Sequence, residues 1–80
     1  MRLDKFLKVA RVIKRRTIAN EACDAGKVLV NGKNARASYD VKVGDVVEVG
    51  LGAKAMKFEV LQVSKFVKKE DADKLYRVLN

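Results

Sequence analysis

The sequence predicts an α+β fold in which two short helices pack on a small, mostly antiparallel β-sheet. Apolar residues recur at helical spacing near the N-terminus, an Asn-Gly pair separates two short β-type runs, and valine-rich runs fill the second half. Eighty residues suffice for one small domain, so we expect residues 1–80 to form a single unit.

The first helix is predicted from five apolar residues that share one arc at 100° per residue. These residues are Leu3, Phe6, Leu7, Ala10 and Ile13. The opposite, polar arc holds Asp4, Lys8, Arg11 and Arg15. A continued helix would turn Lys14 into the apolar face, so we expect the helix to loosen over residues 12–15 into a tight turn.

A second helix is predicted over residues 17–25. Thr17 offers an N-cap hydroxyl, and Gly26 is a natural residue to follow the helix. Its inner face is expected to consist of Ile18, Ala19, Ala22 and Cys23. The small alanines allow close approach to the first helix, which would place the joining segment, residues 14–16, at an exposed corner.

The remaining elements are expected to be strands. Residues 28–30 and 33–35 flank the Asn31-Gly32 pair, which favours a two-residue type I′ hairpin turn. Further strands are predicted over residues 41–49, with a turn at Gly44-Asp45, and over 57–63, with residues 50–52 as the connecting loop. Residues 68–74 form a short helical turn at best, and 75–79 a closing strand.

The side chains expected in the core include Cys23, Phe6, Phe58 and Phe66. Tyr39 and Tyr76 fit the rim of the core, and the alternative is that they stack on unpaired bases.

The sequence contains no histidine and one cysteine, which argues against a zinc site, an internal disulfide, a cofactor or imidazole-based catalysis. We therefore expect a protein that is not an enzyme.

The positive charge is concentrated at one end of the chain. Residues 1–16 contain seven basic and one acidic side chain, which accounts for +6 of the formal net charge of +8. Scattered lysines would serve solubility equally well, whereas a concentrated patch suits a polyanion, because each neutralised phosphate releases counterions. Nucleic acid is therefore the predicted class of partner.

Four short motifs resemble the RNA-binding domain named after ribosomal protein S-four. They are Arg2-Leu3-Asp4-Lys5-Phe6-Leu7, Arg16-Thr17-x-Ala19, Gly26-Lys27-Val28-x-Val30-Asn31-Gly32 and Val43-Gly44-Asp45-x-Val47. Each motif alone is weak evidence, but the order and spacing of all four agree with those of this family. The resemblance implies a two-helix face, called the alpha-L motif, that binds structured RNA, and the chain is most similar to free-standing members that act in ribosome-associated quality control.

That resemblance further implies binding to large ribosomal subunits that carry peptidyl-tRNA after stalled translation. The chain would contact ribosomal RNA and the tRNA and help a partner quality-control elongation factor to add an alanine tail. The related heat-shock-protein-fifteen group, which recycles obstructed large subunits, is an alternative. Its members usually have a longer basic C-terminal extension.

The RNA-binding residues are expected among the basic side chains and one hydroxyl. They are Arg2, Lys5, Lys8, Arg11, Lys14, Arg15, Arg16, Thr17, Lys33 and Arg36. Arg2 and Arg16 match the family motifs most directly, and a guanidinium can bind a phosphate through two hydrogen bonds. For Arg2, the alternatives are a flexible terminus or an ion pair within the chain. Asp4 is either an ordinary first-turn carboxylate or a residue that orients Arg16 or Arg11.

Two other functions stay open at this level. A DNA-binding helix-turn-helix is possible in outline, although Glu21 and Asp24 in the second helix argue against it. A protein-interaction module that binds an acidic partner is the other.

The sequence has no membrane-spanning apolar run and no secretory signal, so we expect a cytoplasmic protein. No apolar stripe is left over for a dimer, so we expect a monomer.

Overall fold

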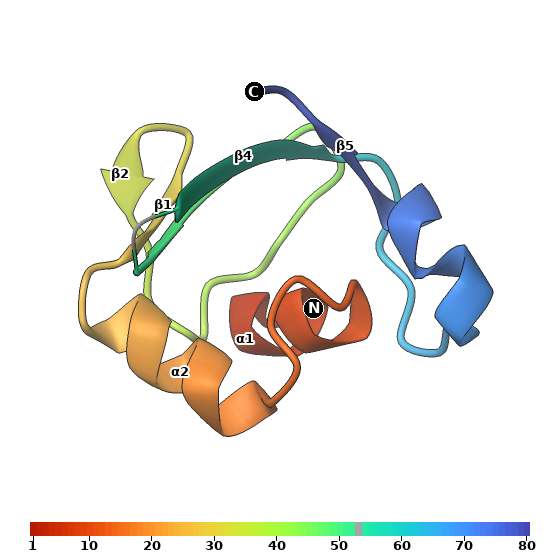
Figure 1. Ribbon diagram of the computed structural model, residues 1–80, viewed down its shortest axis with the longest axis horizontal. Coiled ribbons are helices and arrows are strands. Elements are labelled where there is room, and N and C mark those ends of the chain that lie inside the picture. The colour runs from red at the N-terminus through yellow and green to blue at the C-terminus, as the bar shows by residue number, and fades with distance from the viewer. Residues whose placement is uncertain (53) are drawn as a thin grey trace.

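Two helices cover one face of a five-stranded antiparallel sheet in the computed structural model, which describes residues 1–52 and 54–80 (Figure 1). The helices are α1 (Leu3–Val9) and α2 (Arg16–Asp24). The strands are β1 (Val28–Val30), β2 (Lys33–Asn34), β3 (Val46–Leu51), β4 (Lys54–Val60) and β5 (Tyr76–Val78). A 3₁₀ helix, η1 (Lys69–Leu75), precedes β5. The predicted fold class is confirmed.

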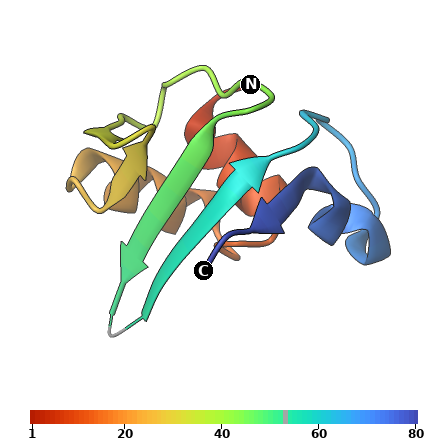
Figure 2. The ribbon, with the colours of Figure 1, turned by 90° about the horizontal axis from the view of Figure 1, so that it is seen from above.

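The sheet has the order β2-β1-β3-β4-β5, and every neighbouring pair is antiparallel (Figure 2). The β1–β2 hairpin turns at Asn31 and Gly32, whose φ angles of 52° and 82° are those of the predicted type I′ turn. Strand β3 extends through Gly50 and Leu51, so the predicted loop at residues 50–52 is wrong for its first two residues. Ala53 lies outside the described residues.

The core lies between α1 and the inner face of the sheet. Alternate strand residues point toward the helices, and Phe6 of α1 stacks on Phe58 of β4 with ring centroids 6.3 Å apart. Tyr76 packs against Phe58 at the rim, as the rim interpretation predicts. Cys23 is buried as expected, whereas Phe66 is 90% exposed, so its assignment to the core is wrong.

Helix α1 ends earlier than predicted. It stops at Val9, and Arg11 adopts a left-handed conformation with φ of 59°. The Arg11 N–H donates to Lys8 O at 3.0 Å and the Val12 N–H donates to Leu7 O at 3.0 Å, which is the Schellman arrangement. Ala10 and Ile13 are nevertheless buried, because the tight turn directs both into the core.

Helix α2 begins one residue before its predicted start. Arg15 is the N-cap and Arg16 the first helical residue, and no side chain caps the helix, so the prediction of Thr17 as the N-cap is wrong. Ile18 is largely exposed, unlike the rest of the predicted inner face. Gly26 follows the helix with φ of 79°, as expected of a residue without a Cβ.

Two predicted strands differ from the structure. Residues 41–43 form no strand because the Asp45 carboxylate accepts the Lys42 N–H at 3.0 Å and closes a turn, and only Asp40 forms a bridge, with Arg2. Strand β4 spans residues 54–60 instead of 57–63, because the chain leaves the sheet after Val60 to reach η1. The helical turn and closing strand near the C-terminus are confirmed. Among the described residues, no helix is long and apolar enough to cross a membrane.

Candidate nucleic-acid interface

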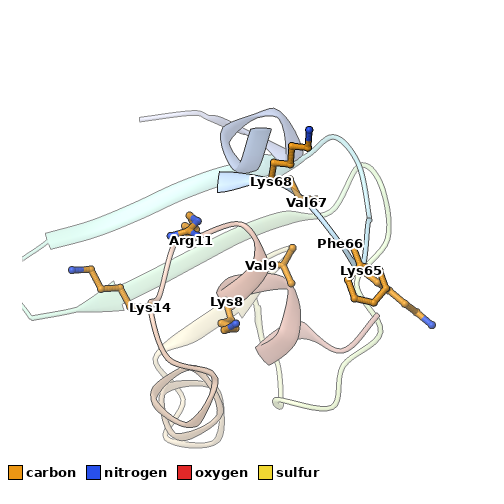
Figure 3. Close-up of a pocket in the computed structure, with 8 residues that line it drawn as sticks. All are labelled: Lys8, Val9, Arg11, Lys14, Lys65, Phe66, Val67 and Lys68. Carbon is orange, nitrogen blue, oxygen red and sulfur yellow. The ribbon is translucent and has the colours of Figure 1, made fainter. Parts of the chain in front are cut away.

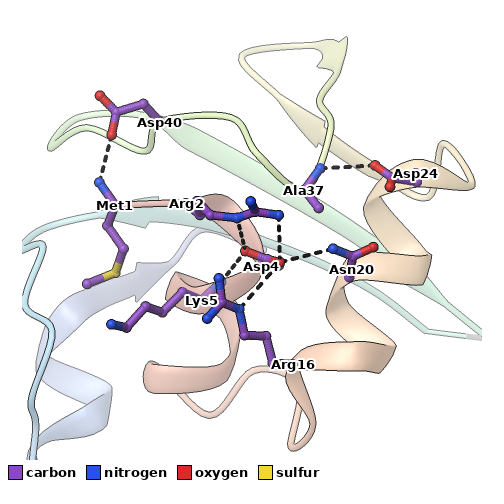
Figure 4. Close-up of polar contacts among 9 residues, drawn as sticks. All are labelled: Met1, Arg2, Asp4, Lys5, Arg16, Asn20, Asp24, Ala37 and Asp40. Carbon is purple, nitrogen blue, oxygen red and sulfur yellow. Dashed lines mark hydrogen bonds and ion pairs between the residues drawn. The ribbon is translucent and has the colours of Figure 1, made fainter.

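The buried carboxylate of Asp4 is the centre of the polar contacts between α1 and α2 (Figure 4). Its Oδ1 atom accepts hydrogen bonds from the Lys5 N–H at 2.8 Å and from Arg2 Nε at 3.2 Å. Its Oδ2 atom accepts from Asn20 Nδ2 at 3.1 Å and from the terminal guanidinium nitrogen of Arg2 at 3.3 Å. Arg16 Nε lies 3.5 Å from the same oxygen. Asp4 therefore orients Arg2 and Arg16.

The position of Asp4 differs from the expected one. The helical periodicity places Asp4 on the solvent-facing arc, yet its exposure is only 1%. Burial by itself raises the pKa of Asp4, but the hydrogen bonds from Arg2, Asn20 and the Lys5 N–H, together with the charge of Arg16, outweigh it and leave the pKa below its ordinary value. The carboxylate is therefore ionised at neutral pH and can hold two cations.

The N-terminal segment is fixed in place, which decides where Arg2 lies. The Leu3 N–H donates to Tyr39 O at 2.8 Å, and the Val41 N–H donates to Met1 O at 2.8 Å. The terminal amine forms an ion pair with Asp40 at 2.6 Å. The alternative of a flexible terminus for Arg2 is therefore wrong. Arg2 does form an ion pair within the chain, but half of its side chain stays exposed, so the prediction that it contacts RNA stays open.

Helix α2 supplies the other half of this arrangement. Arg16 and Asn20 are four residues apart, so they lie on the same face of the helix, directed at Asp4. The Asp24 carboxylate, one turn further along, accepts the Ala37 N–H at 3.1 Å and ties the end of α2 to the segment after the hairpin. These contacts fix the orientation of α2 relative to residues 1–4.

Both arginines keep part of their guanidinium free. The side chains of Arg2 and Arg16 are 49% and 47% exposed. Arg2 directs Nε and one terminal nitrogen at Asp4, and Arg16 directs its Nε. A guanidinium has five N–H donors, so the donors that do not face Asp4 can bind a phosphate through two parallel hydrogen bonds. Together with Asp4, Thr17, Asn20 and Glu21 they line one shallow depression, which we call the Asp4 site.

The other predicted RNA-binding residues lie in separate groups. Lys8, Arg11 and Lys14 line a groove at the end of α1. Lys33 and Arg36 line a different hollow beside the hairpin. Arg15 is exposed, and Lys5 is partly buried. The predicted exposed corner at residues 14–16 is confirmed by the exposure of all three side chains.

Sequence reasoning did not identify several residues of these surfaces. Asn20 was missed, although its spacing of four from Arg16 on a predicted helix is a signal that places both on one face. Lys65, Phe66 and Lys68 also line the groove at the end of α1. No local sequence signal brings this segment, more than fifty residues away in the chain, to that groove.

The described residues contain neither a metal-binding group nor an activated cysteine. Within residues 1–52 and 54–80, no group of His, Cys, Asp and Glu side chains could hold a metal ion. Burial, with smaller effects from the charges of Asp4 and Asp24, raises the pKa of the Cys23 thiol to about 11, which leaves it a poor nucleophile. The free guanidinium edges at the Asp4 site are its evident binding groups.

The chain is similar to one family of known proteins. The S4 domain model matches residues 1–47, which include α1, α2 and the hairpin. Two relatives called RQC P-site tRNA stabilizing factor share 49% identity with the chain. The Streptococcus pneumoniae relative matches over 100% of this chain and 91% of its own length, and the Bacillus subtilis relative over 99% and 92%.

A solved structure of a related protein has the same fold as this chain. Heat shock protein 15 of Vibrio cholerae, described as trimeric, superimposes with a TM-score of 0.92 at 31% identity, covering 99% of this chain and 81% of that one. The family match, the full-length relatives and the shared fold together show that the chain belongs to the S4-domain family.

Proposed function

We propose that the protein is an RNA-binding factor, not an enzyme, that associates with large ribosomal subunits carrying peptidyl-tRNA. It would contact ribosomal RNA and tRNA and support a partner quality-control elongation factor as that factor adds an alanine tail to a stalled nascent chain. The names of the relatives that match the whole chain support a role at the P-site tRNA. Such a partner would place the activity in the cytoplasm.

The observation that carries this proposal is the pair of half-exposed arginines held by buried Asp4. The pair presents two guanidiniums in a fixed relative position. This arrangement suits two phosphates of a folded RNA, whose spacing is also fixed, better than it suits a flexible polyanion. Recognition would then depend on the shape of the RNA backbone and not on base sequence. We infer that residues 1–80 act as one unit, because one core joins α1 to β4 and η1. We also propose that this unit acts as a monomer.

A heat-shock-type role is the second candidate, and the close superposition on heat shock protein 15 favours it. In that case the protein would bind obstructed large subunits and recycle them without supporting alanine addition. A DNA-binding role has less support, since α2, which would be the recognition helix, carries Glu21 and Asp24 and few side chains that could read base edges.

The test is co-sedimentation with purified large subunits, with and without bound peptidyl-tRNA, in a sucrose gradient. The Arg2→Ala/Arg16→Ala variant should lose binding while the wild type binds more strongly when peptidyl-tRNA is present. A Lys27→Ala/Lys42→Ala variant is the matched control, because it also removes two exposed positive charges but leaves the Asp4 site intact. It should bind nearly as well as the wild type.

The outcomes separate the candidates. If the wild type does not sediment with either form of subunit, the ribosomal proposal is wrong. If both double variants lose binding equally, binding depends only on the net charge of the protein, and the proposal that the Asp4 site binds RNA is wrong. Binding without any effect on alanine addition in a reconstituted reaction would favour the heat-shock-type role.

A further inference from the structure

A basic groove lies at the end of α1, away from the Asp4 site (Figure 3). One wall is formed by the last turn of α1 and the loop that follows it, and the other by residues 65–68. Its lining contains five cationic side chains and no carboxylate. These cations are Lys8, Arg11, Lys14, Lys65 and Lys68. A groove of this charge is complementary to a polyanion.

Phe66 projects from the second wall of the groove. Its side chain is 90% exposed, while the adjacent Val67 packs against the core and anchors the segment. The Ser64 hydroxyl donates a hydrogen bond to Phe66 O at 3.2 Å, which further fixes the backbone there. A single exposed apolar side chain is common on protein surfaces. This ring is unusual because the groove that it lines contains four lysines and one arginine besides two valines.

Arg11 occupies a position that favours glycine. It is the residue after the C-cap of α1, with φ of 59°, and it closes the Schellman arrangement described above. A side chain with a Cβ is strained in this conformation, and strained residues gather at functional sites. The fold alone would therefore prefer glycine, and what arginine adds at this position is a guanidinium in the groove.

We propose that this groove is a second RNA-binding site, in which an unpaired nucleotide stacks on Phe66 and the flanking phosphates pair with Arg11, Lys14 and Lys68. This inference rests on the proposed RNA-binding function but concerns a different surface. Aromatic rings beside cationic tracks are the common platform for single-stranded RNA, since every base offers a π-face. A protein partner would need more apolar surface than Val9, Phe66 and Val67 provide.

The experiment uses the absence of tryptophan from the sequence. A Phe66→Trp variant carries one indole, located at the proposed stacking position. Titration with a twelve-nucleotide oligoadenylate should quench its fluorescence, whereas a twelve-base-pair RNA duplex should not, because paired bases cannot stack on the ring. The variant should keep the wild-type affinity for the single strand, since indole also stacks.

Phe66→Leu removes the aromatic ring but keeps an apolar side chain. Its affinity for oligoadenylate should fall by about 5- to 100-fold, the usual effect of losing one stacked base, with no change for the duplex. Arg11→Gly should weaken the same interaction several-fold although glycine suits the backbone there, so unfolding cannot explain the loss. Lys27→Ala, which removes one exposed charge outside the groove, should have little effect.

Two results would overturn this inference without affecting the proposed function. One is an unchanged affinity of Phe66→Leu for oligoadenylate, and the other is quenching of the indole only after a protein partner is added. If either occurs while Arg2 and Arg16 are still required for subunit binding, the Asp4 site is the RNA-binding surface and the groove is not. Failure of the wild type to bind both RNA and subunits would instead reject the proposed function.

Discussion

The Oδ2 atom of Asp4 lies 3.5 Å from the Nε atom of Arg16, so a buried carboxylate in the first turn of α1 holds an arginine in the first turn of α2. The same carboxylate holds Arg2, which comes from the segment before α1. One acidic residue in a strongly basic region thus arranges two cations that would otherwise repel each other.

Asp4→Asn tests whether position or charge governs binding. The substitution raises the formal net charge from +8 to +9, so a purely electrostatic interface would bind RNA more tightly. We expect several-fold weaker binding to large subunits, because Arg2 and Arg16 lose their common anchor. We also expect the free energy of unfolding to fall by about 1.5–3 kcal/mol, the usual range for hydrogen bonds to a charged group.

Urea unfolding and co-sedimentation measure the two effects of that substitution. Glu70→Gln is the control, because it makes the same change of charge at an exposed side chain outside the Asp4 site. Tighter binding by Asp4→Asn, equal to that of the control, would show that the carboxylate does not position the arginines.

The stability of the protein should decrease in acid. The pKa values of Asp4 and Asp45 are lowered in the folded state, mainly because hydrogen bonds and nearby cations outweigh the effect of burial. A carboxylate whose pKa is lower in the folded state stabilises the fold at pH values above its unfolded pKa of about 3.9. This contribution is lost as the pH falls through the folded pKa.

Urea unfolding at several pH values should therefore show a stability that is nearly constant from pH 7 to 5 and falls below about pH 4. The Asp4→Asn/Asp45→Asn variant should lose much of this dependence, because amides do not titrate. An equally steep decrease in that variant would assign the acid sensitivity to other carboxylates.

Arg11→Gly should make the protein more stable. Arginine is strained at φ of 59°, and glycine adopts this conformation without a clash. Part of the gain is offset by the greater flexibility of glycine in the unfolded chain, so we expect an increase of about 0.5–1 kcal/mol in the free energy of unfolding. Thermal or urea unfolding measures it.

Lys8→Gly is the matched control, since it places glycine at an exposed position inside α1, where it should cost about 1 kcal/mol. If both variants are destabilised alike, the backbone at Arg11 is not strained.

Cys23 should be unreactive in the folded protein. Its thiol is buried, and its pKa is raised to about 11 by burial first and then by the charges of Asp4 and Asp24. Little thiolate exists at pH 8, and the reagent cannot reach it. A disulfide reagent such as dithionitrobenzoate should react at the rate of unfolding under native conditions, and immediately in guanidinium chloride. Fast reaction of the native protein would contradict the burial of Cys23.

The sequence determined the elements whose signals are local. The type I′ hairpin follows from Asn31-Gly32, the end of α2 from Gly26, and the apolar face of α1 from residues spaced three and four apart. The concentration of charge near the N-terminus also predicts a basic surface there, and the resemblance to the S4-domain motifs singles out Arg2 and Arg16 within it. These features need no information about distant residues.

The tertiary structure decided the features that depend on residues far apart in sequence. Periodicity placed Asp4 in solvent, and only the approach of Arg16 and Asn20 from α2 makes its burial favourable. Local hydrophobicity placed Phe66 in the core, but Phe6 and Phe58 already fill the space between α1 and the sheet, and Val67 takes the inward position beside it. Which polar group is buried and which apolar group is exposed depends on packing between elements, and a pattern within one segment does not contain that information.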